Sequence, residues 1–410
     1  MTSRTQDPVA TTPAHPGGWL MATLLLQIVF GILAMTLCLP SMPAWATEFG
    51  ASQASVQLTF SAYVAAFGGL QLVYGPWSDR VGRKPLLLGG MALALLGSVI
   101  AALAPNLVVL VLGRVLQGAG SAAGMSVGRA MVQDFFSGRE RTRMMAYVGM
   151  AMGTCPPLAT LLGGQVHVAL GWQANFWIAA ALALVALVAG WRGLPARKPA
   201  RAAVPSHWLA ALFTAYARLL REPAFLCYVL IIATLTSTFY CFLSGAPIVL
   251  TQYGVGPDRM GWYIMAVPIP YILGNVLTSR LVHRIGDSRL MGLGFFSVQA
   301  GLWLMLLLAW AGLRTPWAFA LPLMLLGFGH GMISPTAISG TVGLIPALAG
   351  AAAAVAGASQ QVLGSFGSYV VGLLEHDGPV GLGLLMMGFS LLGGVAQLLL
   401  RYVVRRKPAA

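Results

Sequence analysis

Apolar and polar residues follow one another along this chain in long blocks. Mostly apolar runs are separated by short clusters of charged and turn-forming residues. A helix needs about 20 apolar residues to cross the hydrocarbon core of a bilayer, so each long run predicts one membrane-spanning helix. Twelve runs meet this condition: 19–41, 53–75, 84–104, 106–134, 143–167, 171–191, 224–249, 258–280, 289–311, 316–341, 348–374 and 379–402.

Composition supports a membrane protein. Hydrophobic residues make up 58% and charged residues 8% of the 410 positions, whereas soluble domains carry roughly 25% charged residues. The 50 glycines and 24 prolines fit closely packed and interrupted helices in a bilayer. The four cysteines all fall within apolar runs, which favours free buried thiols over a disulfide framework. The expected fold class is an all-α membrane protein with twelve transmembrane helices.

The net charge of +14 is distributed according to topology. If both termini are cytoplasmic, only Arg259 and Arg314 fall in loops on the opposite side, and Arg114 lies within a span. All other Lys and Arg residues then lie on the cytoplasmic side, as the positive-inside rule requires. The basic excess is therefore a topology signal, and no nucleic-acid partner is expected.

Polar segments divide the spans into two groups of six. The longest interior segment, 192–223, is rich in Pro and Arg and then amphipathic, which predicts a cytoplasmic linker on the membrane surface. It separates an N-terminal six-helix bundle, 19–191, from a C-terminal six-helix bundle, 224–402. We expect residues 1–18 to form a disordered cytoplasmic tail and residues 403–410 to form a basic cytoplasmic tail.

An internal repeat with a constant offset of 204 residues relates the two groups. LPSMP ends at Pro43 and LSGAP ends at Pro247, while the loop DRVG from Asp79 matches HRIG from His283. Paired bundles with a site between them are the architecture of alternating-access transporters. A channel or a membrane enzyme with the same duplication is the alternative at this point.

The stretch GPWSDRVGRKP, residues 75–85, joins the second and third spans. Its glycines allow a tight turn, and its aspartate can pair with arginine. It resembles the signature loop of the major facilitator superfamily, G-x-x-x-D-R-x-G-R-K, at all six fixed positions. The resemblance implies two six-helix bundles and a charge network that latches them in the outward-facing state. Its expected members are Gly75, Asp79, Arg80, Gly82, Arg83 and Lys84, with Arg129 and Asp134 from the fourth span.

The fourth span begins GRVLQGAGSAAG and carries Arg114 inside the hydrocarbon region. An unpaired arginine there costs at least about 2.5 kcal/mol, so we expect it to face the cavity or a polar neighbour such as Gln117. The pattern R-x-x-Q-G-x-G resembles the fourth-helix motif of the superfamily, in which the arginine is associated with proton transfer. A structural arginine bonded to backbone carbonyls is the alternative.

The fifth span contains GTCPPLATLLGG, residues 153–164. It resembles the motif of drug antiporters, which marks export, although Thr160 stands where closer relatives often carry a second proline. Helix packing alone also favours such prolines and glycines. Together with much of residues 30–180, the stretch resembles the Bcr/CflA subfamily of drug and metabolite exporters. The motif residues are Gly153, Pro156, Pro157, Gly163 and Gly164.

The chain departs from that subfamily at Thr36, where relatives usually carry a proton-binding aspartate. The acids all fall outside the central part of the spans: Asp7, Glu48, Asp79, Asp134, Glu140, Glu222, Asp258, Asp287, Glu375 and Asp377. A proton antiporter usually has a mid-membrane carboxylate, which leaves three alternatives. Glu48 lies deeper than expected, His330 titrates near neutral pH, or the protein does not couple to protons there. A hydrogen-bonded packing histidine is the plainer interpretation of His330.

The substrate class follows partly from these charges. A cavity without acids does not favour organic cations, and Arg114 in such a cavity would favour neutral or anionic compounds. Copper is a competing substrate, because Met35, Cys38 and Met42 share one helix face. Cys241, His330 and Met332 could add soft ligands, but the 19 methionines spread through apolar helices are mostly packing residues.

The sequence therefore predicts a monomeric secondary active transporter of the bacterial inner membrane that exports a small amphiphilic molecule by alternating access. Its partners are the substrate and the lipid bilayer, with proton coupling left open. No enzyme motif appears in a convincing context, and no cofactor or metal centre is expected. Export of a metabolite such as a siderophore, or import of copper or another solute, are the alternatives. The expected substrate or proton pathway comprises Thr36, Gln71, Arg114, Gln117, Tyr240, Asn275 and His330.

Overall fold

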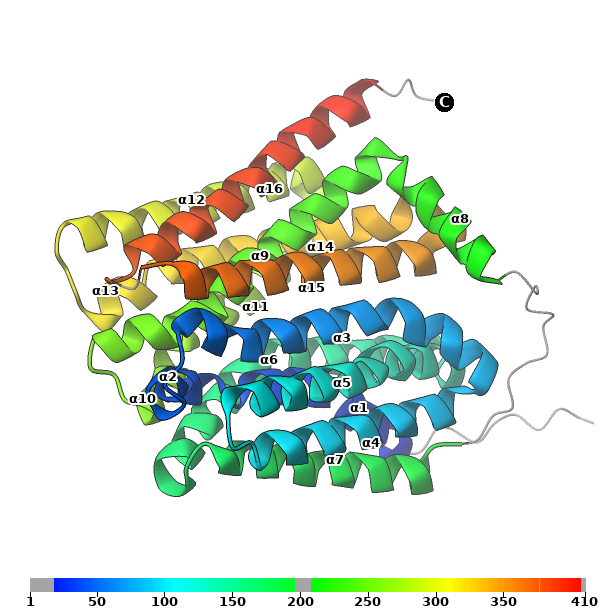
Figure 1. Ribbon diagram of the computed structural model, residues 1–410. Helices are drawn as coiled ribbons and strands as arrows, with labels where there is room; N and C mark the ends of the chain where they lie inside the picture. The colour runs from blue at the N-terminus through cyan, green and yellow to red at the C-terminus, as the bar shows by residue number, and fades with distance from the viewer. Residues whose placement is uncertain (1–17, 196–207, 376, 407–410) are drawn as a thin grey trace, which may run out of the picture.

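The computed structural model describes residues 18–195, 208–375 and 377–406, and all their regular elements are helices (Figure 1). The first part contains α1 (Gly18–Thr36), η1 (Leu39–Ser41), α2 (Met42–Glu48), α3 (Gln53–Val81), α4 (Arg83–Ala102), α5 (Leu107–Phe135), α6 (Gly138–Leu170) and α7 (Gln173–Gly193). The second contains α8 (Trp208–Leu220), α9 (Pro223–Gln252), α10 (Pro257–Ile264), α11 (Pro268–Ile285), α12 (Asp287–Trp310), α13 (Pro316–Ala320), α14 (Leu323–Gly343), η2 (Pro346–Leu348), α15 (Ala349–Leu373) and α16 (Val380–Arg406). Except for Gly18, the predicted N-terminal tail lies outside the described residues, and α16 extends into the predicted C-terminal tail.

Within the described residues, the twelve predicted spans are confirmed as twelve long helical segments. Eleven are long and apolar enough to cross a membrane, three of them built from consecutive helices. The twelfth is α15, which has 25 residues and coincides with the predicted run 348–374. Gln360 and Gln361 lower the hydropathy of α15. The helix can carry them because it packs against α3 and α9 inside the protein rather than only against lipid.

The first span is interrupted in its outer part. Helix α1 ends at Thr36, and the chain continues through η1 and α2. Pro40 and Pro43 each lack the backbone N–H that a continuous helix needs, so the hydrogen-bond ladder is lost twice within one turn. The matching segment of the seventh span contains only Pro247, and α9 runs through it without a break.

The internal repeat is visible in the backbone. Helix α3 covers 53–81, and α10 with α11 covers 257–285, which is the same interval shifted by the sequence offset of 204. The loop that follows each turns at a glycine: Gly82 has φ 105° and ψ 145°, and Gly286 has φ 84° and ψ 154°. Side chains are disfavoured at such positive φ values. The DRVG and HRIG loops therefore form the same turn.

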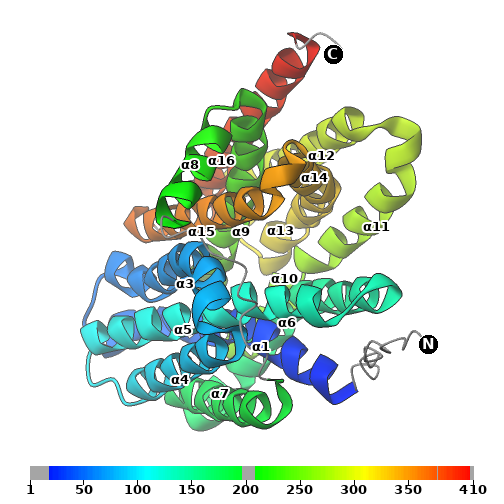
Figure 2. The ribbon, with the colours of Figure 1, turned by 90° about the vertical axis from the view of Figure 1, so that its right-hand side faces the viewer.

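Two halves, α1–α7 and α9–α16, lie side by side, with α3 against α15 at their boundary (Figure 1). We call the end that carries the α3–α4 loop, α8 and both described chain ends the inner face, and the opposite end the outer face. The inner face lies on the right in Figure 1 and toward the viewer in Figure 2. Helix α8 lies in the segment predicted as a surface linker.

Large apolar side chains remain exposed around both halves. Leu162 on α6, Leu307 on α12 and Leu398 on α16 are each more than half exposed, at 59%, 56% and 65%. Such a surface is unfavourable in water and suits contact with lipid chains.

Candidate functional site

A cavity of about 400 Å³ lies between the two halves. Its walls come from α1, α5 and α6 on one side and from α9, α11, α14 and α15 on the other. Drug-sized ligands occupy pockets of about 300–1,000 Å³ that are mostly apolar with a few polar groups. The apolar wall includes Ile32, Met35, Met152, Pro156, Ile232, Leu235, Phe239, Val267 and Ile338. The polar side chains on it are Arg129, Thr236, Tyr240, Tyr271, His330, Ser334 and Gln360.

Close contacts between the halves seal the outer side of this cavity. Gln57 Nε2 donates to the Ser244 carbonyl at 3.1 Å, and Gln165 Nε2 donates to the Asp258 carbonyl at 3.1 Å. Beside the second bond, Gly164 lies against the Pro257 carbonyl so closely that a Cβ would overlap it. The described residues form one more hydrogen bond between the halves, from Ser365 Oγ to the Ser61 carbonyl, eight residues from the outer ends of α15 and α3. Within the described chain, these bonds leave the inner side without a comparable seal.

Arg114 lies outside the cavity and caps the break in the first span. Its guanidinium donates to the carbonyls of Ala34 (2.8 Å) and Met35 (3.3 Å), which belong to the last turn of α1. It also donates to the Thr59 carbonyl at 3.2 Å and to Gln117 Oε1, and its exposed fraction is 0%. A cation at a helix C-terminus satisfies free carbonyls and the helix dipole. Arg114 does not line the cavity in this conformation, but its bond to Gln117 is the contact expected with a polar neighbour. Its bonds to backbone carbonyls match the structural alternative, and a role in proton transfer stays a prediction.

Two of the other predicted pathway residues, Tyr240 and His330, line the cavity. Thr36 and Gln117 are fully buried, and Thr36 Oγ1 donates to the Ile32 carbonyl one turn back in its own helix. Gln71 and Asn275 also bond carbonyls of their own helices, Phe67 and Tyr271. The structure therefore does not bring the seven residues together at one site, and the roles of Tyr240 and His330 stay predictions.

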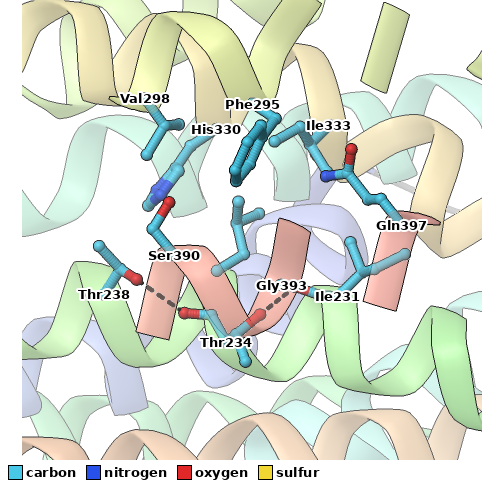
Figure 3. A pocket seen from close by; sticks show the side chains of 11 residues that line it. Ile231, Thr234, Thr238, Phe295, Val298, His330, Ile333, Ser390, Gly393 and Gln397 are labelled. Carbon is cyan, nitrogen blue, oxygen red and sulfur yellow. Dashed lines mark hydrogen bonds between the residues drawn. The ribbon is translucent and has the colours of Figure 1, made fainter. Parts of the chain in front are cut away.

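His330 lies between two spaces. Besides the central cavity it lines a small pocket of about 20 Å³ inside the second half (Figure 3). Figure 3 shows the His330 ring and the Ser390 side chain pointing into this pocket, with Thr234 and Thr238 beside them. The volume suits one water molecule. His330 is 4% exposed and makes no hydrogen bond within the described parts of the chain, so the packing histidine with hydrogen-bond partners is not what this conformation contains.

The predicted gating residues split into two groups. Arg83 binds Asp79 at 2.7 Å and Asp134 at 3.1 Å, so the α3–α4 loop is tied to the end of α5. Lys84 Nζ donates to the carbonyls of Trp191 and Leu194 at the end of α7. These contacts all stay within the first half, so Arg83 and Lys84 form no latch to the second half as far as the described residues go. Gly75, Arg80 and Gly82 belong to the same loop region, whereas Arg129 lies in the cavity wall.

The predicted antiporter motif on α6 contacts residues of both halves. Gly153 and Pro156 line the cavity, and Pro157 is buried beside them. Gly163 lies against the Leu37 carbonyl at the break in the first span, whereas Gly164 lies against Pro257 of the other half. The adjacent glycines therefore have different partners: one packs within the first half and the next closes the outer seal.

Sequence reasoning missed several cavity residues. Thr236, Tyr271, Ser334 and Gln360 line it, as does Arg129, which was assigned to the gate. On α9 the lining positions 232, 235, 236, 239 and 240 follow the three-and-four spacing of one helix face. That stripe was available in the sequence, but in a helix that is apolar all round it does not stand out.

Acids and soft ligands do not gather in the cavity. Every described carboxylate lies in a loop or within the first or last turn of a helix. Glu48, the deeper-lying alternative for a proton site, is exposed at the outer end of α2 and accepts from Trp172 Nε1 at 2.8 Å. Of the residues considered for copper, Met35 and His330 reach the cavity. Among the described residues, no group of three or more His, Cys, Asp or Glu side chains could hold a metal ion.

Comparison with known proteins gives one family. Residues 24–368 match the Major Facilitator Superfamily. Multidrug resistance protein D of Escherichia coli is 28% identical over 379 residues, which are 91% of this chain and 93% of that protein. The chloramphenicol resistance protein of Pseudomonas aeruginosa is 29% identical over 364 residues, or 87% and 85% of the two chains. A bicyclomycin resistance protein homologue of Haemophilus influenzae is 25% identical over 366 residues, or 87% and 91%.

A solved structure shares the fold. A bacterial homologue of the human lysosomal transporter Spinster, crystallised in an inward-facing and unoccupied conformation, superposes with a TM-score of 0.74. The match covers 97% of this chain and 100% of that one at 15% sequence identity. The likeness concerns the arrangement of helices alone.

Proposed function

Since the chain belongs to the Major Facilitator Superfamily and is a multi-pass membrane transporter with drug-resistance relatives, we propose that it exports small amphiphilic molecules by alternating access. The observation that carries the proposal is the cavity of about 400 Å³ between the halves, sealed at the outer face. Repeated bundles that rock about a central site are the device of such transporters. The names of the relatives support multidrug or antibiotic substrates.

The cavity wall supports an amphiphilic substrate. Aliphatic, methionine and aromatic side chains from both halves offer an adaptable apolar surface, and hydroxyl and amide groups such as Thr236, Ser334 and Gln360 offer hydrogen bonds. A substrate that contacts both halves can favour a conformational change, because its contacts differ between the two states.

The proposed direction is outward, with both chain ends in the cytoplasm. The inner face carries most of the basic residues, which the positive-inside rule assigns to the cytoplasm. In this conformation the seal lies on the opposite side, so a cytoplasmic substrate could enter between the halves. Localisation in a bacterial inner membrane follows from this topology and from the relatives in Escherichia coli and Haemophilus influenzae.

His330 is the proposed proton carrier. It lies on the cavity wall, where the other titratable or charged side chains are Arg129, Tyr240 and Tyr271, and the small pocket behind it contains hydroxyl groups. No described carboxylate is within the middle of a span to take this task. Histidine changes charge in the physiological pH range. If the His330 ring takes up a proton from one side of the membrane and releases it to the opposite side, transport is coupled to a pH gradient.

Transport in proteoliposomes tests the function. The probes are chloramphenicol as a neutral compound, naphthalene-1-acetate as an anion and ethidium as a cation. We expect at least one probe to accumulate several-fold above protein-free liposomes when the lumen is more acidic than the medium. Replacing His330 by glutamine should abolish accumulation driven by the gradient and leave equilibrium binding in place.

Two outcomes would contradict these proposals. If none of the three probes moves faster than in protein-free liposomes, the proposed function fails. If His330→Gln accumulates probe as well as the unaltered protein does, His330 is not the proton carrier.

A further inference from the structure

Arg129 is a half-buried arginine with almost no partners among the described residues. It lies on α5 and forms part of the cavity wall. Its Nη2 contacts Met152 Sδ at 3.1 Å, and a thioether is a weak acceptor. Its Nε is buried without any hydrogen-bond partner, and Nη1 bonds none of the described residues. A guanidinium has five N–H donors, so most of the hydrogen-bonding capacity of this side chain is unused.

No acid of the described chain neutralises Arg129. Asp134, the acid nearest to it along α5, binds Arg83 at 3.1 Å instead. The other described ion pairs join Arg83 to Asp79 and Arg259 to Asp258. Among the described residues that line the cavity there is no carboxylate. The guanidinium is partly withdrawn from water and lacks a counter-ion, so an anion that enters the cavity would gain a charge-assisted hydrogen bond.

Arg114 provides the contrast on the same helix. Its donors reach three backbone carbonyls and the Gln117 side chain, and the Tyr63 ring lies 4.2 Å from its guanidinium carbon. A saturated, fully buried arginine is part of the scaffold. Arg129 has the opposite arrangement, since its unpaired donors lie at the wall of a cavity large enough for a small molecule.

We propose that Arg129 is the anchor for an organic anion, so that the cavity prefers amphiphiles with a carboxylate or similar group over cations. This inference rests on the proposed function and names the substrate class of the same site. The planar guanidinium fork matches a carboxylate in a bidentate pair. Apolar side chains around it, including Ile32, Met152 and Phe239, would hold the hydrophobic body of the ligand.

Equilibrium binding with matched probes tests the anchor. The full-length protein in lipid nanodiscs is titrated calorimetrically with naphthalene-1-acetate, its uncharged analogue naphthalene-1-acetamide, and 1-naphthylmethylammonium, with empty nanodiscs as reference. We expect the acetate to bind about tenfold or more tightly than the amide. Arg129→Gln should remove this preference and leave amide binding within about twofold, and Arg129→Lys should retain part of it because the charge remains without the fork.

A surface control variant and the contradicting outcomes complete the design. Arg141 is exposed near the inner end of α6, so Arg141→Gln should keep the preference of the unaltered protein. Equal binding of acetate and amide, absent acetate binding, or an unchanged preference in Arg129→Gln with its melting temperature preserved would overturn the anchor. Chloramphenicol transport that persists beside such a result would keep the proposed function, whereas loss of transport of every probe would remove both.

Discussion

Replacing Arg114 by alanine is expected to destabilise the whole protein rather than to stop a single transport step. The guanidinium holds the last turn of α1 and the Thr59 carbonyl of α3 together, and it is fully buried. Its removal leaves several buried carbonyls without donors and a void where the side chain was. Unsatisfied buried acceptors cost about 1–3 kcal/mol each, so a loss of roughly 3–5 kcal/mol is expected. A thermal unfolding experiment on purified protein should show a large fall in the melting temperature.

Three variants separate a scaffold arginine from a proton-transfer arginine. Arg114→Met keeps the side-chain volume but has no donors, so it should be destabilised almost as much as Arg114→Ala. Arg139→Ala, at an exposed position, should melt like the unaltered protein. Thr36→Val removes one bond within α1 and should cost about 1 kcal/mol or less. An Arg114→Met protein with normal melting but no pH-driven transport would contradict the scaffold role and support the motif's association with proton transfer.

Replacing Gly164 by alanine is expected to prevent the outer face from closing. A Cβ at this position would overlap the Pro257 carbonyl of the other half, and a backbone atom cannot move away at little cost. The clash exists only in the conformation that is closed outside. A cost of about 5.5 kcal/mol would shift the two states from 99:1 to 1:99, and a smaller cost would give a partial shift. Transport should fall strongly while the protein remains folded.

Pulsed electron paramagnetic resonance can measure this shift. Spin labels at Thr47 and Arg314 report on the outer ends of the two halves, and labels at Arg141 and Arg289 report on the inner ends; all four positions are exposed. In Gly164→Ala the outer distance should lengthen and the inner distance should shorten. Gly89→Ala, where a Cβ meets nothing within 4 Å, should leave both unchanged. Unaltered distances in Gly164→Ala would show that this contact does not control the seal.

Local sequence patterns determine much of this fold. Each span corresponds to one continuous run of mostly apolar residues, so the twelve helices could be predicted without tertiary information. The α3–α4 loop could be predicted for the same reason, because a glycine with positive φ and its neighbouring charges lie within a few residues. The repeated turn at Gly82 and Gly286 follows from this local rule.

The roles of Arg114 and Arg129 could not be predicted from local patterns in the same way. Arg114 and Arg129 lie on one helix, and their sequence neighbours do not reveal which of them meets free carbonyls. Those carbonyls exist because α1 ends at Thr36, and they reach Arg114 only through the packing of α1 on α5. Likewise, Asp134 binds Arg83 from a different helix and not Arg129, which precedes it on α5. Partner choice of this kind is a tertiary property.

A removable cross-link at the outer seal tests alternating access most directly. In a variant without Cys38, Cys155, Cys227 and Cys241, cysteines are placed at Gln165 and Asp258, whose side chain and carbonyl now form a hydrogen bond at 3.1 Å. They are joined by a short bis-methanethiosulfonate reagent. The cross-linked protein should bind the transported probe but not move it across the liposome membrane, and a reductant should restore transport. Transport at the full rate while the cross-link is intact would contradict alternating access through this cavity.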